Sequence, residues 1–504
     1  MFGIVKTAHA SKLGEVQKMS YQMINALDYE IMPNVVQCTV DYIEKLKTDD
    51  GVFLDYLRDN TNFSNDYDVL IALCEQDPEF ARSEYFRDRK RKIVESYMMN
   101  FKSGKVIQNA DNLVIVGSPY AMLLHSVGAD PLSDPTFEQE DGTIQCYTGR
   151  FATGDYLAEF RSPFNGRNNL GYLHNVHHEY FDKYFNLGNQ IIAVNMIGTD
   201  FQDRNNGSDQ DSDSLYVTNQ PNIVQCAKEY YSLYSTIVNN IPKESNHYCN
   251  TLESFADIDN RLAAAQMAIG SSANLAQICL TYMYNFEDQK YVDYVCILSV
   301  LSQVAIDNAK RSFDIDLNNE IARIKADMDI DKNGYPAFWG IIRREFNKSK
   351  INTKLKCPMN FIFDIETQRF RSPDSTIPMS KFFVKYEMEL SNRKSMKVEE
   401  LIEQYSLDLY QYNTADEEDV DGQYLLLRDD FNQLIEDIKG VYISKNYMGL
   451  MSWLIDRALC ITPQQKGKRN VIKSTLDTNR SLLLKTLYTV NKCSFLKCFS
   501  GNIR

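Results

Sequence analysis

The chain has 504 residues, which is enough for two to four domains of ordinary size. Hydrophobic residues make up 44% and charged residues 24%, so the composition excludes a disordered, collagen-like or disulfide-dense protein. The formal net charge of −14 argues against a protein that coats DNA through many phosphate contacts, but it is compatible with an enzyme that has a local basic channel.

The first hundred residues are predicted to be mainly helical. Residues 13–60 place apolar side chains every three or four positions, which is the spacing of one helix face. Residues 82–95, with the sequence RSEYFRDRKRKIVE, form a strongly basic stretch of helical character. Such a stretch is usually a solvated helix face, and in a nucleic-acid enzyme it becomes a candidate contact for nucleic acid.

A different pattern occupies residues 105–220. Short apolar runs are separated there by Gly, Pro and Asn, and each run has the length of a β-strand. The runs are NLVIVGSP, TIQCYTG, YLAEFRSPF, QIIAVNMIG and SLYVTNQP. They predict a compact β domain of the barrel kind.

Helical spacing returns after the β-rich region. It is found in the segments 226–243, 257–284, 290–313 and 317–328. Residues 331–358 are expected to be a connector, and residues 380–504 are expected to be mainly helical, with a second basic stretch at 466–473. A β module between helical regions is an α+β plan.

An unusual group of acidic residues lies in the sequence GSDQDSDS at 207–214, directly before the strand-like LYV. Asp209, Asp211 and Asp213 fall within five residues. Three close carboxylates repel one another by about 1 kcal/mol per pair in high dielectric, and a loop that curls them around one hard cation turns that repulsion into binding. Mg²⁺ is typically held by such carboxylates together with substrate phosphates. The pattern favours a metal that serves phosphoryl or nucleotidyl transfer.

Other interpretations of the aspartates are weaker. A calcium loop of the EF-hand type needs Gly at position 6 and Glu at position 12, where this chain has Ser214 and Gln220. A phosphatase D-x-D nucleophile follows an apolar strand directly, whereas the preceding residues here are DRNNGS. An acidic surface turn is the alternative that the spacing alone leaves open.

Two further segments resemble metal sites only in part. The sequence DIDKNG at 329–334 matches the first half of a calcium loop, but position 12 would be Gly340 and Pro336 interrupts the loop. The sequence HNVHH at 174–178 has the density of a zinc cluster but lacks spaced partner ligands. Neither is expected to bind a metal.

The surroundings of the aspartates resemble a known family. The order FRSPF (160–164), then QIIAVNMIG, then GSDQDSDSLYVT resembles the second double-psi β-barrel of multisubunit-type RNA polymerases. It is closer to the single-chain branch, namely the RNA-dependent RNA polymerases of eukaryotic gene silencing and related phage and bacterial polymerases. That branch carries an R-x-P segment, a strand and a D-x-D-G-D loop that binds the catalytic Mg²⁺. The family's glycine in this loop is Ser212 here.

Flanking segments extend the resemblance over roughly residues 1–313. Residues 2–27 resemble the end of the family's first barrel and its exit helix, and residues 109–128 resemble the start of the second barrel. Residues 267–277 resemble an I-G-x-x-x-N helix, and residues 302–313 resemble S-x-A-V-D-x-x-K. In the last of these segments Asp307 and Lys310 take the family's positions.

Together the pattern and the resemblance divide the chain into five regions. They are the end of a first barrel with its exit helix (1–30), a helical connector (31–104), the second double-psi β-barrel with the metal loop (105–225), a helical region (226–330) and a mainly helical C-terminal region (331–504).

The resemblance implies a Mg²⁺-dependent RNA polymerase that copies a nucleic-acid template from nucleoside triphosphates. The three aspartates would hold the metal, and Lys12 would act with them on the reactive phosphates; either Lys12 or Lys6 takes the place of the family's second lysine. Lys6, Arg161 and Lys310 would bind substrate phosphates, ribose or the nucleic-acid backbone. Outside the family frame these lysines are ordinary surface cations, and Asp307 with Lys310 is a helix-surface ion pair worth about 0.3 kcal/mol. Template choice between RNA and DNA stays open.

Compared with the family, this sequence is expected to carry only the end of the first barrel. A second chain that supplies this barrel is therefore a possible partner, and a fragment or degenerate copy is the other explanation. The alternative functions are a non-catalytic nucleic-acid-binding or scaffold subunit that keeps the polymerase fold, and a metal-dependent nuclease that uses the same carboxylates.

The cysteines and the hydropathy bear on location. Eleven cysteines without a C-x-x-C pair favour free thiols in a reducing compartment. The start MFGIVKTAHASKLG lacks the basic-then-apolar order of a secretory signal, and no apolar run approaches the 18 residues of a membrane span. We expect a cytoplasmic protein that does not contact a membrane.

Overall fold

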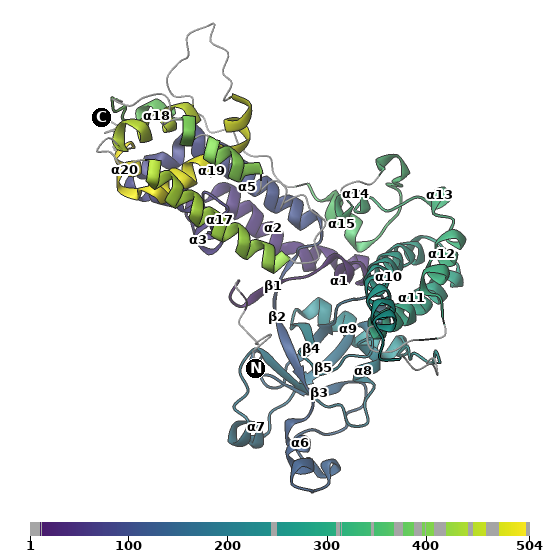
Figure 1. Cartoon of the computed structure of the whole chain (residues 1–504). Helices are drawn as coiled ribbons and strands as arrows, with labels where there is room; N and C mark the ends of the chain where they lie inside the picture. Colours follow the sequence, from purple (N-terminus) through teal and green to yellow (C-terminus); the bar gives the residue numbers. More distant parts are fainter. Residues whose placement is uncertain are drawn as a thin grey trace. The chain divides into compact units, whose positions relative to one another are not determined.

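A computed structural model describes residues 11, 13–242, 249–308, 313, 315–343, 347–366, 376–387, 396–398, 400–407, 420–441, 447–459 and 473–499 (Figure 1). The chain divides into two compact units. The first contains Met1–Tyr42 and Tyr97–Thr367, and the second contains Ile43–Ser96 and Gln368–Arg504. No helix in the described part of the chain combines the length and the apolar character that a membrane crossing requires.

The second unit is helical throughout its described residues. Helices α2 (Met32–Thr48) and α5 (Glu84–Lys102) each run from one unit into the other. The remaining elements of this unit are α3 (Asp50–Asp59), α4 (Tyr67–Gln76), η2 (Pro78–Arg82), η6 (Met379–Lys381), α17 (Val420–Val441), α18 (Tyr447–Leu459), α19 (Lys473–Val490) and α20 (Lys492–Lys497). Phe80 lies at the centre of its core and makes edge-on contacts with the rings of Phe86, Phe382 and Phe499.

The basic stretch on α5 is paired with acidic side chains. Arg87 and Lys90 both donate to Asp50, with Lys90 Nζ 2.7 Å from its carboxylate. Other ion pairs join Arg89 to Asp66, Arg91 to Asp88 and Glu95, and Lys92 to Asp88. Lys90 is 1% exposed and also lies over the Phe53 ring. Because these cations already have carboxylate partners, the stretch serves the packing of this unit, and a role in nucleic-acid contact stays a prediction.

The first unit is built around a closed β-barrel. Its described strands are β1 (Val16–Lys18), β2 (Ile107–Val116), β3 (Ile144–Tyr147), β4 (Tyr156–Phe160), β5 (Gly171–Asn175), β6 (Ile191–Val194) and β7 (Ser214–Thr218). The pairing order is β2-β6-β3-β5-β4-β7, and β7 pairs with β2 again, so these six strands close on themselves. The pairs β2–β6 and β3–β5 are parallel and the other pairs are antiparallel. Closure leaves no free sheet edge, as in other barrels.

Strand β2 makes closure possible because its ten residues pair with three partners. Its first three residues pair with β1, residues 110–114 with β7, and residues 114–116 with β6. Alternate residues of the strands point into the barrel, where they form one apolar core. The core residues are Leu113, Ile115, Ile144, Cys146, Phe151, Leu157, Leu173, Ile192, Val194, Phe201, Leu215 and Val217. The α+β class with a barrel that carries the D-x-D-x-D loop is thus confirmed.

Helices follow and interrupt the barrel strands within the same unit (Figure 1). The long helix α10 (Leu252–Asn285) packs antiparallel on α11 (Gln289–Asp307), and the buried hydroxyls of Ser272 and Ser302 are 2.7 Å apart between them. The other elements are α1 (Tyr21–Asn25), η1 (Tyr29–Ile31), α6 (Pro119–Ser126), η3 (Pro131–Ser133), η4 (Arg167–Asn169), α7 (Glu179–Tyr184), α8 (Phe201–Arg204), α9 (Pro221–Leu233), α12 (Leu317–Asp327), α13 (Ile330–Asn333), α14 (Trp339–Ile342), η5 (Lys348–Lys350) and α15 (Pro358–Asp364).

Gly171 on β5 provides a test of how the barrel interior is packed. It pairs with Glu159 on β4, and a Cβ added to Gly171 would collide with the Glu159 carboxyl group. We expect Gly171→Ala to lower the free energy of unfolding by about 1–3 kcal/mol, as overpacked cores do. The measurement is the urea midpoint of the purified chain.

Gly270 is the matched control. A Cβ at Gly270, in the middle of α10, meets nothing within 4 Å. Gly270→Ala should therefore stabilise the protein by about 0.5–1 kcal/mol through the helix preference of alanine. If Gly171→Ala raised the free energy of unfolding as Gly270→Ala does, the Glu159 carboxyl group could not fill the space beside Gly171.

Candidate metal centre

The aspartate loop connects α8 to β7. Its last residue, Asp213, is fastened to the barrel because the Ile115 backbone N–H on β2 donates to the Asp213 carbonyl at 2.9 Å. At its beginning, Asn206 and Gly207 both have positive φ, at 54° and 71°, so the chain turns sharply after α8. The loop is therefore held at the rim of the barrel where β2 and β7 pair.

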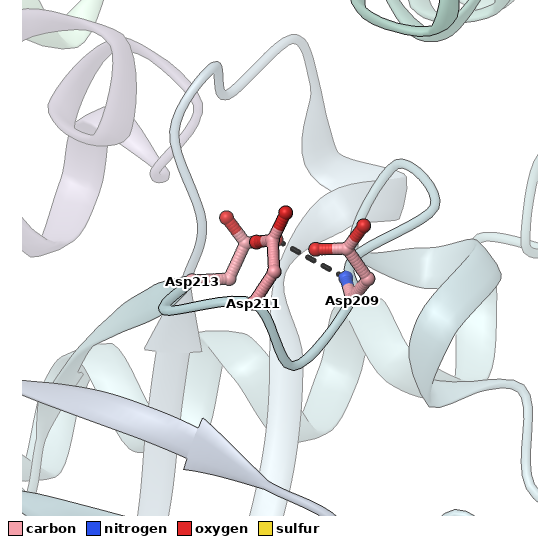
Figure 2. A group of neighbouring side chains, drawn as sticks. All are labelled: Asp209, Asp211 and Asp213. Atoms are coloured by element: carbon pink, nitrogen blue, oxygen red, sulfur yellow. Dashed lines mark hydrogen bonds between the residues drawn. The ribbon is translucent and has the colours of Figure 1, made fainter. Parts of the chain in front are cut away.

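The three aspartate side chains converge (Figure 2). One carboxylate oxygen from each of Asp209, Asp211 and Asp213 lies within 4.8 Å of the others. Asp211 is exposed, and the other two are partly buried. Oxygen ligands of one Mg²⁺ lie about 3–4 Å apart because each Mg–O bond is about 2.1 Å, so a small closing movement would suffice. Three oxygen donors with an open, solvent-facing side fit a hard divalent cation.

Arg161 fixes the Asp213 carboxylate through hydrogen bonds. It follows β4 and is 8% exposed. Its Nε and Nη2 donate to Asp213 Oδ2 at 3.1 and 2.7 Å, and the Asp209 backbone N–H donates to the same oxygen at 3.1 Å. Three donors thus occupy Oδ2, which directs the second oxygen of Asp213 to other partners. Arg161 Nη1 donates to the Asn205 carbonyl at 2.8 Å, so the guanidinium is fixed at both ends.

Ser212 takes the backbone conformation for which glycine is suited. Its φ is 104°, in the region that L side chains rarely adopt. Keeping a non-glycine residue there costs about 1–3 kcal/mol. This is the position at which the D-x-D-G-D pattern has glycine, and in this chain serine occupies it with strain.

The structure describes only some of the other residues that the sequence predicted for the site. Lys6, Lys12 and Lys310 lie outside the described residues, and their roles stay predictions. Asp307 is the last residue of α11. Arg161 is brought to the aspartates, but its printed bonds are to protein groups, so phosphate or ribose binding by Arg161 is likewise a prediction.

The side chains of the two segments with partial metal motifs contact other protein groups. Among the described residues, the three aspartates are the only group of His, Cys, Asp or Glu placed to hold a metal ion. His174 bonds Glu140 at 2.8 Å and His177 bonds Asp182 at 2.9 Å. Asp331 of the DIDKNG segment pairs with Lys350 at 2.8 Å.

Two residues behind the loop were missed by sequence analysis. Glu159 on β4 is fully buried, and burial raises the pKa of its carboxyl group to about 7. Asn205 at the end of α8 donates to it at 2.9 Å. The available signal was the alternation of β4: Leu157 points into the core, so Glu159 two residues later lies on the same side of the strand.

Comparison with known proteins finds similarity to a solved structure. No family model matches the chain, and no curated protein matches its sequence. The chain is similar to the solved structure of the RNA dependent RNA polymerase QDE-1 from Thielavia terrestris, with a TM-score of 0.46 and 13% sequence identity. The match covers 97% of this chain and 57% of that polymerase. This chain thus spans little more than half the length of the protein that it resembles.

Metal binding at the three aspartates can be measured directly. If Mg²⁺ binds with a Kd of about 1 mM, 10 mM Mg²⁺ should stabilise the folded unit by about 1.4 kcal/mol, or about 2 °C in melting temperature. Differential scanning fluorimetry at matched ionic strength measures this shift. Asp211→Asn should remove it, while Asp203→Asn on the exposed face of α8 should not. An equal shift in all three proteins would place the ion elsewhere.

The strain at Ser212 leads to a second prediction. Ser212→Gly should raise the free energy of unfolding by about 1 kcal/mol, because glycine adopts this φ without a steric cost. Ser214→Gly, two residues later in β7, should lower it by about 0.5–1 kcal/mol, because glycine weakens a strand. Urea midpoints of the two variants provide the comparison, and a loss of stability in Ser212→Gly would show that the serine side chain matters more than its strain.

Proposed function

We propose that this chain is an RNA polymerase that transfers nucleotides from nucleoside triphosphates in a Mg²⁺-dependent reaction. The observation that carries the proposal is the convergence of Asp209, Asp211 and Asp213 at the rim of a closed barrel. The sequence order of R-x-P segment, strand and aspartate loop, which resembles that of polymerases, supports it. RNA and DNA are both open as templates.

The proposed chemistry is in-line attack of a 3′-hydroxyl on the α-phosphorus of a triphosphate. A new O–P bond forms, the bond to the bridging oxygen breaks, and pyrophosphate leaves. Bound Mg²⁺ would orient the phosphates and neutralise the charge that develops on them. The three carboxylates would hold the ion, with Arg161 keeping Asp213 in place for that purpose. Lys12, Lys6 or both would add a cation at the reactive phosphates, and Lys310 would be a cation near the primer or template backbone.

A nucleic-acid template and triphosphates are the partners that this function requires. A second chain that supplies the first barrel is a further partner that we propose. A cytoplasmic location completes the proposal. The rival functions, a metal-dependent nuclease and a non-catalytic subunit, would use the same fold, and the assay below separates them.

Primer extension tests the function. The chain should extend a labelled primer on an RNA or a DNA template when nucleotides and Mg²⁺ are present. Loss of a residue that only supports a metal ligand typically lowers activity roughly 10–100-fold. Asp211→Asn should reduce extension by more than this, because it removes a direct metal ligand. Asp203→Asn is the matched control and should extend normally.

The other outcomes of this assay identify the rivals. Shortening of the primer without nucleotides, lost in Asp211→Asn, would identify a nuclease. If the primer is neither extended nor cleaved, by the chain alone or by the chain with a co-purified second chain, the result favours the non-catalytic subunit.

A further inference from the structure

The interior of the barrel makes room for one carboxyl group. Glu159 is fully buried, and it is paired across β4 and β5 with a glycine, Gly171. The space that a side chain at Gly171 would fill is taken by the Glu159 carboxyl group. This acidic group is therefore accommodated by the fold, although it lies on the core side of its strand.

Asn205 and Glu159 share one hydrogen bond and leave two acceptors facing the interior. Asn205 Nδ2 donates to Glu159 Oε1 at 2.9 Å and to the Phe201 carbonyl at 3.1 Å, so both amide hydrogens are used and the orientation of the amide is fixed. Within the described residues, Glu159 Oε2 and Asn205 Oδ1 are buried without a hydrogen-bond partner. Two buried acceptors without a donor are unfavourable. A single proton on Oε2 would serve both, because a protonated carboxyl group is a donor and an amide oxygen is an acceptor.

The charged neighbours of Glu159 are directed elsewhere. Arg161 donates to Asp213 and to the Asn205 carbonyl, and Arg204 donates to Asp200 and to backbone carbonyls of Asn168 and Tyr234. Glu159 interacts electrostatically with five titratable or charged groups, namely Arg161, Arg204, Asp200, Cys146 and Tyr231. Neither arginine forms an ion pair with Glu159 in the described structure, so an ionised Glu159 would lack a direct counterion.

The same residues lead to the metal loop. The Asn205 carbonyl accepts from Arg161 Nη1, and the other side of that guanidinium holds Asp213. Glu159 thus acts on Asp213 through Asn205 and Arg161, without touching the metal ligands.

We propose that Glu159 is a positioning residue that is protonated in the folded protein, and that its carboxyl group pairs with the Asn205 amide through two hydrogen bonds to fix Arg161 behind the metal loop. The positioning role rests on the proposed function of that loop, whereas the protonation of Glu159 does not.

The pKa of Glu159 agrees with this arrangement. Burial raises the pKa from its ordinary value of 4.5 to about 7, and the hydrogen bond from Asn205 and the charges of Arg204 and Arg161 offset only part of that effect. For an acid whose folded pKa is raised, the folded state binds the extra proton. Its contribution to stability is therefore complete below about pH 4.5 and is lost as the pH rises through about 7.

Glu159→Gln tests the protonation. Glutamine accepts through Oε1 and donates through Nε2, as the protonated carboxyl group does, but it cannot ionise. The urea midpoints of wild type and Glu159→Gln should be close at pH 5, and the variant should become the more stable of the two by pH 8. Glu179→Gln, an exposed glutamate on α7, is the control and should show no such divergence. A variant that is less stable than wild type by an amount that grows with pH would overturn the proposal, because it would mean that Glu159 is ionised and stabilised by the arginines.

Mn²⁺ affinity, measured by calorimetry without nucleotides, tests the positioning role. Glu159→Gln should bind Mn²⁺ within about twofold of wild type, whereas Glu159→Leu should bind about 10-fold more weakly, as for other outer-shell losses. Unchanged affinity in a folded Glu159→Leu would overturn the role. If that variant does not fold, Asn205→Ala, which also breaks the pair, takes its place. Wild type that binds no Mn²⁺ would overturn the proposed function and the positioning role together, and the pH series would still decide the protonation.

Discussion

The mutual repulsion of three carboxylates is the constraint to which the first unit is adapted. Asp209, Asp211 and Asp213 are held with their oxygens within 4.8 Å, a distance at which unit charges repel appreciably even near solvent. The fold offsets this repulsion with donors aimed at one of the three, namely the guanidinium of Arg161 and a backbone N–H of the loop itself. What remains of the negative charge is available to a cation.

Barrel closure gives the loop a fixed foundation. The loop ends at β7, and β7 is bonded on both sides, to β2 and to β4. Arg161 follows β4 directly, so the arginine and the last aspartate leave neighbouring strands at the same rim. Their meeting is a consequence of strand pairing and does not depend on loop flexibility. A loop on an open sheet edge would have no comparable constraint.

Buried polar groups lie behind this rim. Asn165, Asn168, Asn169 and Ser208 join Glu159 and Asn205 in having buried polar atoms without a partner among the described residues. Such groups lower stability, and a fold that needed only stability would replace them with apolar side chains. Two of them belong to the rim itself, because Asn169 Nδ2 donates to the Arg204 carbonyl and Ser208 directly precedes Asp209.

Local pattern alone determined several features of this protein. Short apolar runs between turn residues located β2, β3, β4, β6 and β7, because strands of a compact β domain are short and end at turns, and the acidic spacing located the metal loop. Only the tertiary structure decided the rest. It added β5, closed the barrel, turned Arg161 toward Asp213, neutralised the basic stretch on α5 and buried Glu159 opposite Gly171. Each of these depends on residues far apart in the chain, and the pairing of distant residues leaves no periodic trace in a single sequence.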